Sequence, residues 1–226
     1  SVCVGGFYAV PRPSALKALL PELKWGLEKA IATVRWAATL DYPDFEIDYE
    51  FVSLSHPDEY PFNEGTILSS TGLDVSMEDY DKHYIEEHVA HSNALHSRRV
   101  ETGSTYHVGP LARFNLNFEK LSSTVQDLAK EIDLTLPVLN PFYSLIVRSL
   151  ELVQSFEEAI RLIENYKEPR PSRAELPKPL PAGEGAHATE APRGLLYHRY
   201  KVDEQGLITF ARIVPPTAQN LPRIEG

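Results

Sequence analysis

The first regular pattern along the chain is an apolar stripe of helical period within residues 14–40. Its members recur every three or four residues, as one face of a helix requires. The stripe consists of Leu16, Leu20, Leu23, Leu27, Ile31 and Val34. Pro21 stands inside it, and because proline removes a backbone donor we expect a kink or a fresh helix start there. The pattern predicts a helix whose apolar face is buried in a core.

A different pattern follows at residues 45–54, where apolar and polar side chains alternate and aromatic and β-branched residues are frequent. Alternation of this kind is typical of a half-buried strand. Residues 66–70 form a second short candidate strand, and the proline-containing stretch 56–65 between them indicates a loop. The two candidates together predict a small antiparallel sheet.

Three further helices are indicated by their start signals. Ser76 and Asp79 fit a capping box, and residues 77–95 contain no glycine or proline, which predicts a helix to about residue 95. Ser123 and Gln126 mark another start.

A long helix is predicted after Asn140 and Pro141, with one apolar stripe. This stripe consists of Ile146, Ser149, Val153, Phe156, Ile160 and Ile163. The polar face of the helix carries Glu151, Glu157, Glu158 and Arg161, which we interpret as a solvated surface or the rim of a bundle.

The last third of the chain changes in composition. Residues 167–181 are punctuated by prolines and predict an extended connector. Residues 194–216 predict two strands joined by a turn in which Gly206 takes a positive φ. The fold class is therefore α+β, mainly long helices in a bundle with a small antiparallel sheet and a C-terminal β-hairpin. We divide the chain into a helical body (1–166), a connector with an EAPRG loop (167–192) and a hairpin segment (193–226).

Composition excludes several classes of function. The 226 residues include 32 acidic and 22 basic side chains, and a net charge of -10 disfavours a nucleic-acid partner. No apolar run reaches the roughly 18 residues of a membrane span, and no signal peptide is apparent, so we expect no membrane span and a cytoplasmic protein. The single cysteine, Cys3, permits neither an internal disulfide nor a thiolate cage for a metal.

Four histidines are the one local hint of metal binding. His83, His88, His91 and His96 lie in or next to the predicted helix 77–95. His88 and His91 are three apart and would share a face, whereas the other neighbouring pairs are five apart and would not. Exposed or hydrogen-bonded histidines are the commoner finding on a charged helix. Motifs of hydrolases, phosphate-binding loops and dinucleotide-binding loops do not occur.

Residues 188–220 carry a more specific pattern, in which EAPRG precedes the predicted hairpin and PPTAQN follows it. Four upstream stretches, residues 4–8, 48–65, 86–97 and 106–118, complete the pattern. Together, in this order, they resemble the NiFe-hydrogenase large (alpha) subunit. The stretches HSNALHS and VGPLAR are most similar to those of the cytoplasmic multisubunit type of this family.

The resemblance implies a partial hydrogenase large-subunit fold and a Ni-Fe(CN)2(CO) centre in the intact subunit. The family holds its metals with two Cys-x-x-Cys pairs, and neither occurs here. We therefore expect the complete subunit to extend beyond both ends of this sequence. We also expect the chain alone to bind no such centre and to be inactive.

The resemblance also implies roles for four residues. Arg193 would be catalytic, above the open coordination face of the metals, where its planar fork of donors and its permanent charge suit cyanide ligands. Pro192 and Leu196 would line the pocket around the diatomic ligands, and Thr217 would donate a hydroxyl to a second cyanide. Glu190 would orient the loop, and no metal ligand is assigned to this chain.

The implied function is reversible oxidation of dihydrogen. The implied partners are the rest of the large subunit and an iron–sulfur small subunit. Two alternatives stay open. One is a metal-free relative, like the hydrogenase-derived subunit of respiratory complex I, that serves quinone binding or structure. The other is a histidine-rich module that binds nickel or zinc at residues 83–96.

Overall fold

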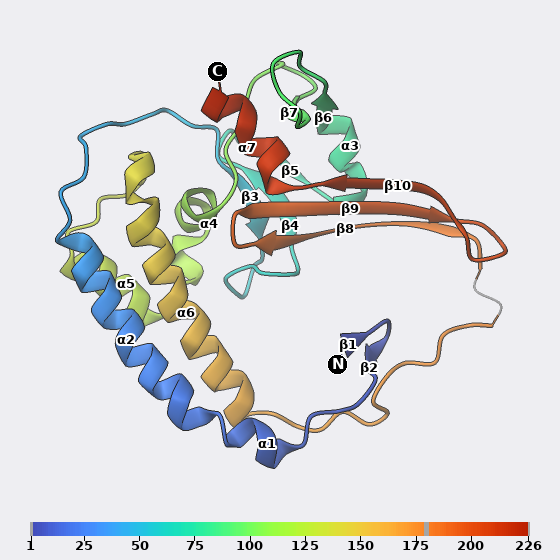
Figure 1. Cartoon of the computed structure of the whole chain (residues 1–226), viewed down its shortest axis with the longest axis horizontal. Coiled ribbons are helices and arrows are strands. Elements are labelled where there is room, and N and C mark those ends of the chain that lie inside the picture. The colour runs from blue at the N-terminus through green and yellow to red at the C-terminus, as the bar shows by residue number, and fades with distance from the viewer. Residues whose placement is uncertain (1, 179–180, 226) are drawn as a thin grey trace.

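A computed structural model describes residues 2–178 and 181–225 (Figure 1). The α-helices are α1 (Pro13–Lys17), α2 (Leu20–Ala38), α3 (Tyr80–His83), α4 (Pro110–Asn117), α5 (Ser123–Glu131), α6 (Ser144–Glu164) and α7 (Pro216–Glu225). Three short 3-10 helices are η1 (Met77–Asp79), η2 (Phe118–Lys120) and η3 (Pro141–Tyr143). The strands are β1 (Val2–Cys3), β2 (Gly6–Phe7), β3 (Val52–Ser55), β4 (Thr66–Ser69), β5 (Asp74–Val75), β6 (Tyr84–Glu87), β7 (His96–Arg99), β8 (Gly183–Ala191), β9 (Gly194–Val202) and β10 (Ile208–Val214).

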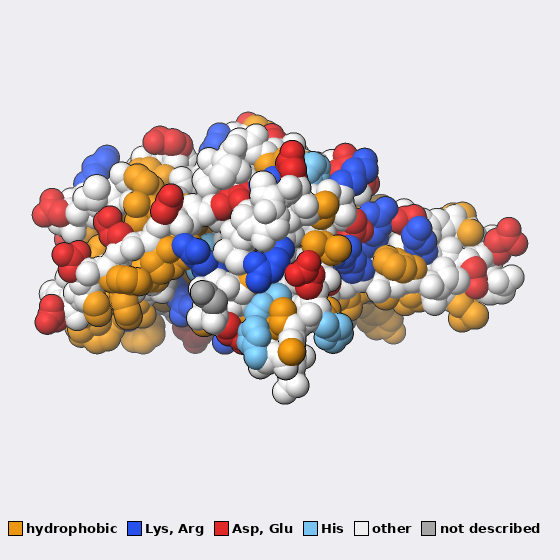
Figure 2. Space-filling model, turned by 90° about the horizontal axis from the view of Figure 1, so that it is seen from above, with side chains coloured by type: hydrophobic (Ala, Val, Ile, Leu, Met, Phe, Trp, Pro, Cys, Tyr) orange, Lys and Arg blue, Asp and Glu red, His pale blue; other side chains and the backbone are white. Residues whose placement is uncertain are grey.

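The helices and the long strands occupy different sides of an elongated molecule. Helices α2, α5 and α6 lie together on one side, and the sheet of β8, β9 and β10 extends away on the other (Figure 1). In the perpendicular view this sheet ends in a narrow arm (Figure 2). No helix of the described residues is long and apolar enough to cross a membrane.

The predicted helix at residues 14–40 is present as α1 and α2, with the fresh start beside Pro21. Helices α2 and α6 pack antiparallel. An ion pair of 3.0 Å between Lys24, near the start of α2, and Glu164, at the end of α6, shows this direction. A Cβ atom added to Gly26 would lie 2.5 Å from the ring of Phe156, so this glycine allows the two helices to approach closely. The most buried residues of α2 are small, namely Gly26, Ala30, Val34 and Ala37.

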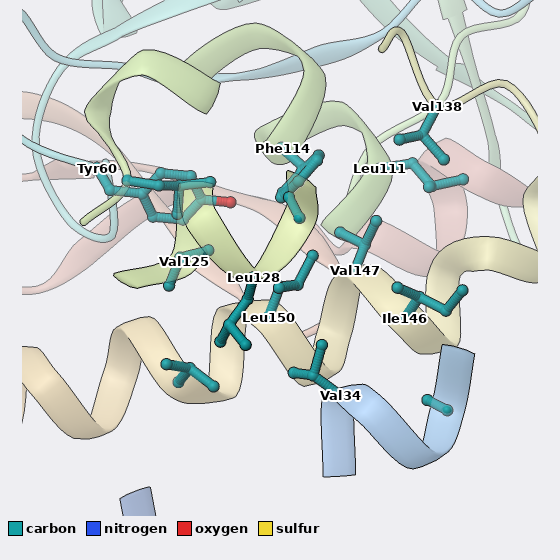
Figure 3. Packing of buried hydrophobic residues seen from close by; sticks show 14 of the residues in the cluster. Val34, Tyr60, Leu111, Phe114, Val125, Leu128, Val138, Ile146, Val147 and Leu150 are labelled. Carbon is teal, nitrogen blue, oxygen red and sulfur yellow. The ribbon is translucent and has the colours of Figure 1, made fainter. Parts of the chain in front are cut away.

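Side chains from α2, α4, α5 and α6 form the first core (Figure 3). Helix α5 begins after Ser122, whose hydroxyl accepts a hydrogen bond from the backbone N–H of Val125. Helix α6 follows Asn140, as predicted. The prediction of a bundle of long helices is not confirmed, because among the described residues only α2 and α6 are much longer than ten residues.

Strands β3, β4 and β5 form an antiparallel sheet, and β4 matches its prediction. The strand prediction is wrong for residues 45–50, which are irregular. Their backbone hydrogen bonds join separate parts of the chain. The N–H of Ile47 donates to Leu139 O, and Glu50 O accepts from the N–H of His107, so no single neighbouring strand in the described part of the chain pairs with them.

The predicted helix 77–95 is also wrong. The chain forms η1 and α3, and then turns into the two-stranded sheet of β6 and β7. Ser76 makes no side-chain cap bond. Tyr80 and Tyr84 are fully buried in a second core and stack on each other, with ring centroids 4.8 Å apart. Tertiary packing therefore ends the helix after one turn, and the helical spacing of the four histidines does not exist.

The predicted hairpin is confirmed as β9 and β10, with Gly206 at a φ of 78°. Two elements of this C-terminal region were not predicted. Residues 183–191, expected to be connector and loop, form β8, which pairs with β9 from Gly183 to Ala191. Helix α7 begins at Pro216, where the missing N–H of proline costs no helical bond. The described connector, residues 167–178, has no regular element beyond one bridge between Arg173 and Gly6, and residues 179–180 lie outside the described part.

Candidate site at the turn between β8 and β9

The EAPRG sequence is a tight turn and not a loop. Glu190 and Ala191 end β8, Pro192 and Arg193 form the turn, and Gly194 begins β9. Gly194 has a φ of 133°, and a Cβ atom there would lie 2.7 Å from the backbone nitrogen of Gly109. A Cβ atom on Gly109, at a φ of 115°, would lie 2.6 Å from Arg193 O. The two glycines thus let the turn rest directly on the backbone at the start of α4.

Arg113 of α4 lies beneath the turn and holds it. Its Nη1 donates to Glu190 Oε2 at 2.9 Å and to Ala191 O at 2.8 Å. Its Nε and Nη2 donate to the two carboxylate oxygens of Glu151, on α6, at 2.7 and 2.8 Å. A bidentate pair of this kind fixes both distance and orientation. Arg113 therefore connects α4, α6 and the end of β8.

Glu190 is the anchor of the turn within the sheet region. Its side chain is fully buried, and Oε1 accepts from the backbone N–H of Leu54 at 2.8 Å. The backbone N–H of Glu190 donates to Phe62 O at 2.6 Å. The expectation that Glu190 orients the turn through hydrogen bonds agrees with these contacts.

The buried cluster contains one guanidinium and two carboxylates. Burial raises the pKa of Glu190, and the charge and hydrogen bond of Arg113 oppose that rise. Burial alone would lower the pKa of Arg113, but the hydrogen bond and charge of Glu151 outweigh it, so the pKa is raised. The hydroxyl of Tyr60 donates to Glu151 Oε1 at 2.6 Å. Burial and the charge of Glu151 raise the pKa of Tyr60 well above its usual value.

A cavity of about 510 Å³ opens beside this cluster. Its wall includes Phe62, Arg148, Leu152, Ser155, Pro192 and Arg193, together with the cluster itself. Arg193 and Pro192 are both exposed, and no hydrogen bond or ion pair joins the Arg193 side chain to another described residue. The turn therefore presents a positive group to the cavity from a fixed backbone.

The other two predicted site residues lie near this turn but do not line the cavity. Leu196 is half-buried in β9, and Thr217 is exposed in the first turn of α7. Helix α7 is tied to the same end of the sheet, because Gln219 Nε2 donates to Leu195 O at 2.5 Å. Asn220 also bonds both backbone groups of Val108, at 2.9 and 3.1 Å. The structure thus groups all four residues at one end of β9.

Arg113 and Glu151 were missed as candidate residues from the sequence. Glu151 was expected on a solvated surface or the rim of a bundle, together with Glu157 and Glu158, but it is buried. The residues one helical turn before and after it, Val147 and Gln154, are also buried, so the buried face of α6 is wider than the predicted stripe. Arg113 carries no signal of its own beyond its place in VGPLAR.

Comparison with known proteins gives the relationship of the chain. No model of a known protein family matches it. The alpha chain of sulfhydrogenase 1 from Pyrococcus furiosus is 32% identical over 225 residues, which cover 98% of this chain and 52% of the relative. The beta chain of the NAD-reducing hydrogenase HoxS from Cupriavidus necator is 29% identical over 168 residues, which cover 63% of this chain and 33% of that protein.

Solved structures share the fold. A NAD+-reducing NiFe-hydrogenase in the H2-reduced state superimposes with a TM-score of 0.70 at 22% identity, covering 96% of this chain and 52% of that chain. This chain belongs to the NiFe-hydrogenase large subunits. The hydrogenase chain spans about half the length of the sulfhydrogenase relative.

The described residues of this hydrogenase chain do not fit as ligands of a nickel–iron centre. The cavity wall offers guanidinium, carboxylate and hydroxyl groups, whereas the family's ligands are thiolates. The one thiol of the sequence, Cys3, is half-buried in β1, which lies apart from the β8–β9 turn (Figure 1). What the turn does fit is a contact around such a centre, made by an exposed guanidinium.

Proposed function

We propose that this chain is part of the large subunit of an enzyme that reversibly oxidises dihydrogen, and that its β8–β9 turn forms one wall of the active site. The observation that carries the proposal is the exposed Arg193 on a turn whose backbone is held by the buried cluster of Arg113, Glu151 and Glu190. A charged side chain on a backbone that is already held in place needs less reorganisation to stabilise charge that develops beside it.

The metals, held by residues outside this chain, would supply the acceptor for hydride. Arg193 would donate hydrogen bonds from its planar guanidinium toward that centre, and its charge would complement an anionic site. Pro192 and Leu196 would keep the surroundings apolar, and Thr217 would supply a further donor. Glu190 would act only through the backbone of the turn.

In the cytoplasm, the chain would work with the remainder of the large subunit and with an iron–sulfur small subunit. Unpartnered aromatic surface supports such packing, because Trp25 and Trp36 of α2 are 62% and 58% exposed. Exposed apolar groups of this size favour burial against another protein surface.

The test is Arg193→Lys in the complete subunit, with hydrogen oxidation and nickel content measured on the same preparation. We expect at least about 100-fold lower turnover with nickel unchanged, the size of effect seen when one preorganised donor is removed. Lysine keeps the charge but loses the planar fork.

The matched control is Arg161→Lys, because Arg161 is an exposed arginine of α6 that pairs only with Glu158 among the described residues. It should turn over like the parent enzyme. Full turnover of Arg193→Lys at full nickel occupancy would remove Arg193 from the site. A complete subunit that contains no nickel would favour the metal-free alternative.

A further inference from the structure

A second group of possible ligands lies at the end of α7. His91 Nε2 and His96 Nε2 both face Glu225 Oε2, at 3.2 and 2.9 Å. Ligand atoms of all three residues lie within 4.8 Å of one another. In place of the four histidines of the histidine-rich alternative, two of them meet a carboxylate from a distant part of the chain.

The three residues come from different elements that pack together. His96 begins β7 and is only 2% exposed, whereas His91 lies in the exposed loop between β6 and β7. Glu225 is at the end of α7, which packs along β7. Ser92 also donates to Glu225 Oε1, at 3.4 Å. Histidine side chains gather on this side of the molecule in the view from above (Figure 2).

The two distances from the imidazoles to Glu225 are close to the spacing of ligand atoms around a transition metal, and the third spacing is within 4.8 Å. Zinc holds imidazole nitrogen and carboxylate oxygen at about 2.0–2.2 Å, so two ligands in a tetrahedron lie about 3.3 Å apart. The distances from Glu225 Oε2 to the two imidazoles are 3.2 and 2.9 Å. Two imidazoles with one carboxylate are a recurrent ligand set for divalent transition metals, with the remaining positions filled by water.

We propose that His91, His96 and Glu225 bind a divalent transition-metal ion of the zinc class. The ion would bind both Nε2 atoms and Glu225 Oε2, replacing the direct contacts between these groups. It would lie at the surface beside the exposed His91 and would keep at least one water ligand.

Without a metal, each imidazole would donate Nε2–H to the same carboxylate oxygen. His96 Nδ1 is buried and has no hydrogen-bond partner among the described residues. In the metal-free state it would be an acceptor without a donor, and in the metal-bound state a donor without an acceptor. This atom therefore does not distinguish the two states, and the convergence of three ligand atoms carries the proposal.

Binding at this place would fix α7 to the β6–β7 sheet. Helix α7 also carries Gln219 and Asn220, which hold Leu195 and Val108 beside the β8–β9 turn. A metal that binds only the folded state stabilises it by mass action. The ion would thus act as a structural clamp for α7, separate from the hydrogen-activating metals.

The experiment uses the complete subunit, dialysed against chelator and then titrated with Zn²⁺, and compares it with His91→Ala and Glu225→Gln. Both side chains are accessible enough to replace without opening the core. Each variant should weaken zinc binding by more than about 10-fold, the loss that even an outer partner of a ligand can cause. Co²⁺ in place of Zn²⁺ should give a spectrum without thiolate bands.

The matched control is His88→Ala, an exposed histidine of the same region that does not belong to the group. It should bind zinc like the parent. Failure of the parent to bind one equivalent of zinc at micromolar concentration would overturn the proposal. Equal affinity in the parent and in His91→Ala would overturn it too, since the zinc would then be bound elsewhere. Neither result bears on the role of Arg193.

Discussion

Two charge clusters along the sheet of β8, β9 and β10 are built in opposite senses. At the buried end, Arg113 lies between two carboxylates, Glu151 and Glu190. Farther along, Asp81 lies between two arginines, Arg199 at 2.9 Å and Arg212 at 2.5 Å. The geometry of the individual ion pairs is similar. Their surroundings differ, since the side chain of Arg113 is 5% exposed whereas those of Arg199 and Arg212 are 23% exposed.

The two clusters should differ in how much stability is lost when one of their charges is removed. A buried charge that loses its partner keeps the cost of its removal from water, whereas a partly exposed charge is rehydrated. The Arg113 cluster should therefore be intolerant of any single change, and the Asp81 cluster tolerant. Only the first cluster lies under the β8–β9 turn, so the rigid part of the sheet is the part that carries Arg193.

The largest effect is expected for Arg113→Met. It leaves two buried carboxylates without their cation, so the free energy of unfolding should fall by about 3–5 kcal/mol. Denaturant unfolding of parent and variant measures the change. Arg113→Met combined with Glu151→Leu and Glu190→Gln should recover part of the loss, and an Arg113→Met protein as stable as the parent would contradict the assignment of the cluster as desolvated.

His107 is a buried titratable group without a counter-charge among the described residues. Burial, aided by Arg223, lowers the pKa of His107 to about 4 from 6.5. A depressed folded pKa adds stability above the unfolded value, and this stability is lost as the pH falls from about 6.5 toward 4. Between pH 7.5 and 5 the parent should lose about 2 kcal/mol more than His107→Gln. Parallel pH profiles of the two proteins would show that His107 is hydrated.

Glu190 and Glu184 give opposite pH dependences. The pKa of Glu190 is raised by burial, so its contribution to stability is full below about pH 4.5 and is lost as the pH rises through the folded pKa. Hydrogen bonds from Lys201 and Arg199 lower the pKa of Glu184, whose contribution is present above about 4.5 and lost as the pH falls.

The measurement is the free energy of unfolding between pH 4 and 7 for Glu190→Gln and Glu184→Gln. Relative to its variant, the parent should lose stability with rising pH in the first pair and gain it in the second. At pH 7 Glu190→Gln should destabilise by about 1–2 kcal/mol through weaker hydrogen bonds to Arg113 and Leu54. The same direction of pH dependence in both pairs would remove the distinction between the two ends of the sheet.

The smallest effect is expected for Asp81→Asn. The two arginines that it leaves are exposed enough to be hydrated, so unfolding should become easier by less than about 1 kcal/mol. Added salt should reduce even this difference, because exposed charges are screened. Denaturant unfolding at low and high salt tests the expectation, and a loss as large as that of Arg113→Met would make the two clusters equivalent.

The sequence predicted those elements whose signals are local. Pro21, Ser123 and Asn140 mark helix starts that the structure has, and Gly206 marks a turn that it has. The resemblance carried by EAPRG brought Arg193 and Pro192 to attention, and both line the cavity.

The sequence failed where distant partners decide. Residues 84–87 form a strand because β7 pairs with them, and Tyr84 is buried in contact with Tyr106. Glu151 resembles its solvated neighbours until Arg113, on another helix, is placed against it. No periodicity within one helix reports a partner of that kind, and the same holds for the meeting of Glu225 with His91.

The contact between Gly109 and Gly194 has a mechanical consequence. Because backbone meets backbone there, with no side chain between, no rotamer can absorb a displacement of α4. A shift of that helix would move the backbone of Arg193 with it, and a shift of α6 would reach the same turn through Arg113. The turn should move together with α4 and α6. Substitutions in these helices that do not line the cavity should therefore change the position of Arg193 relative to it.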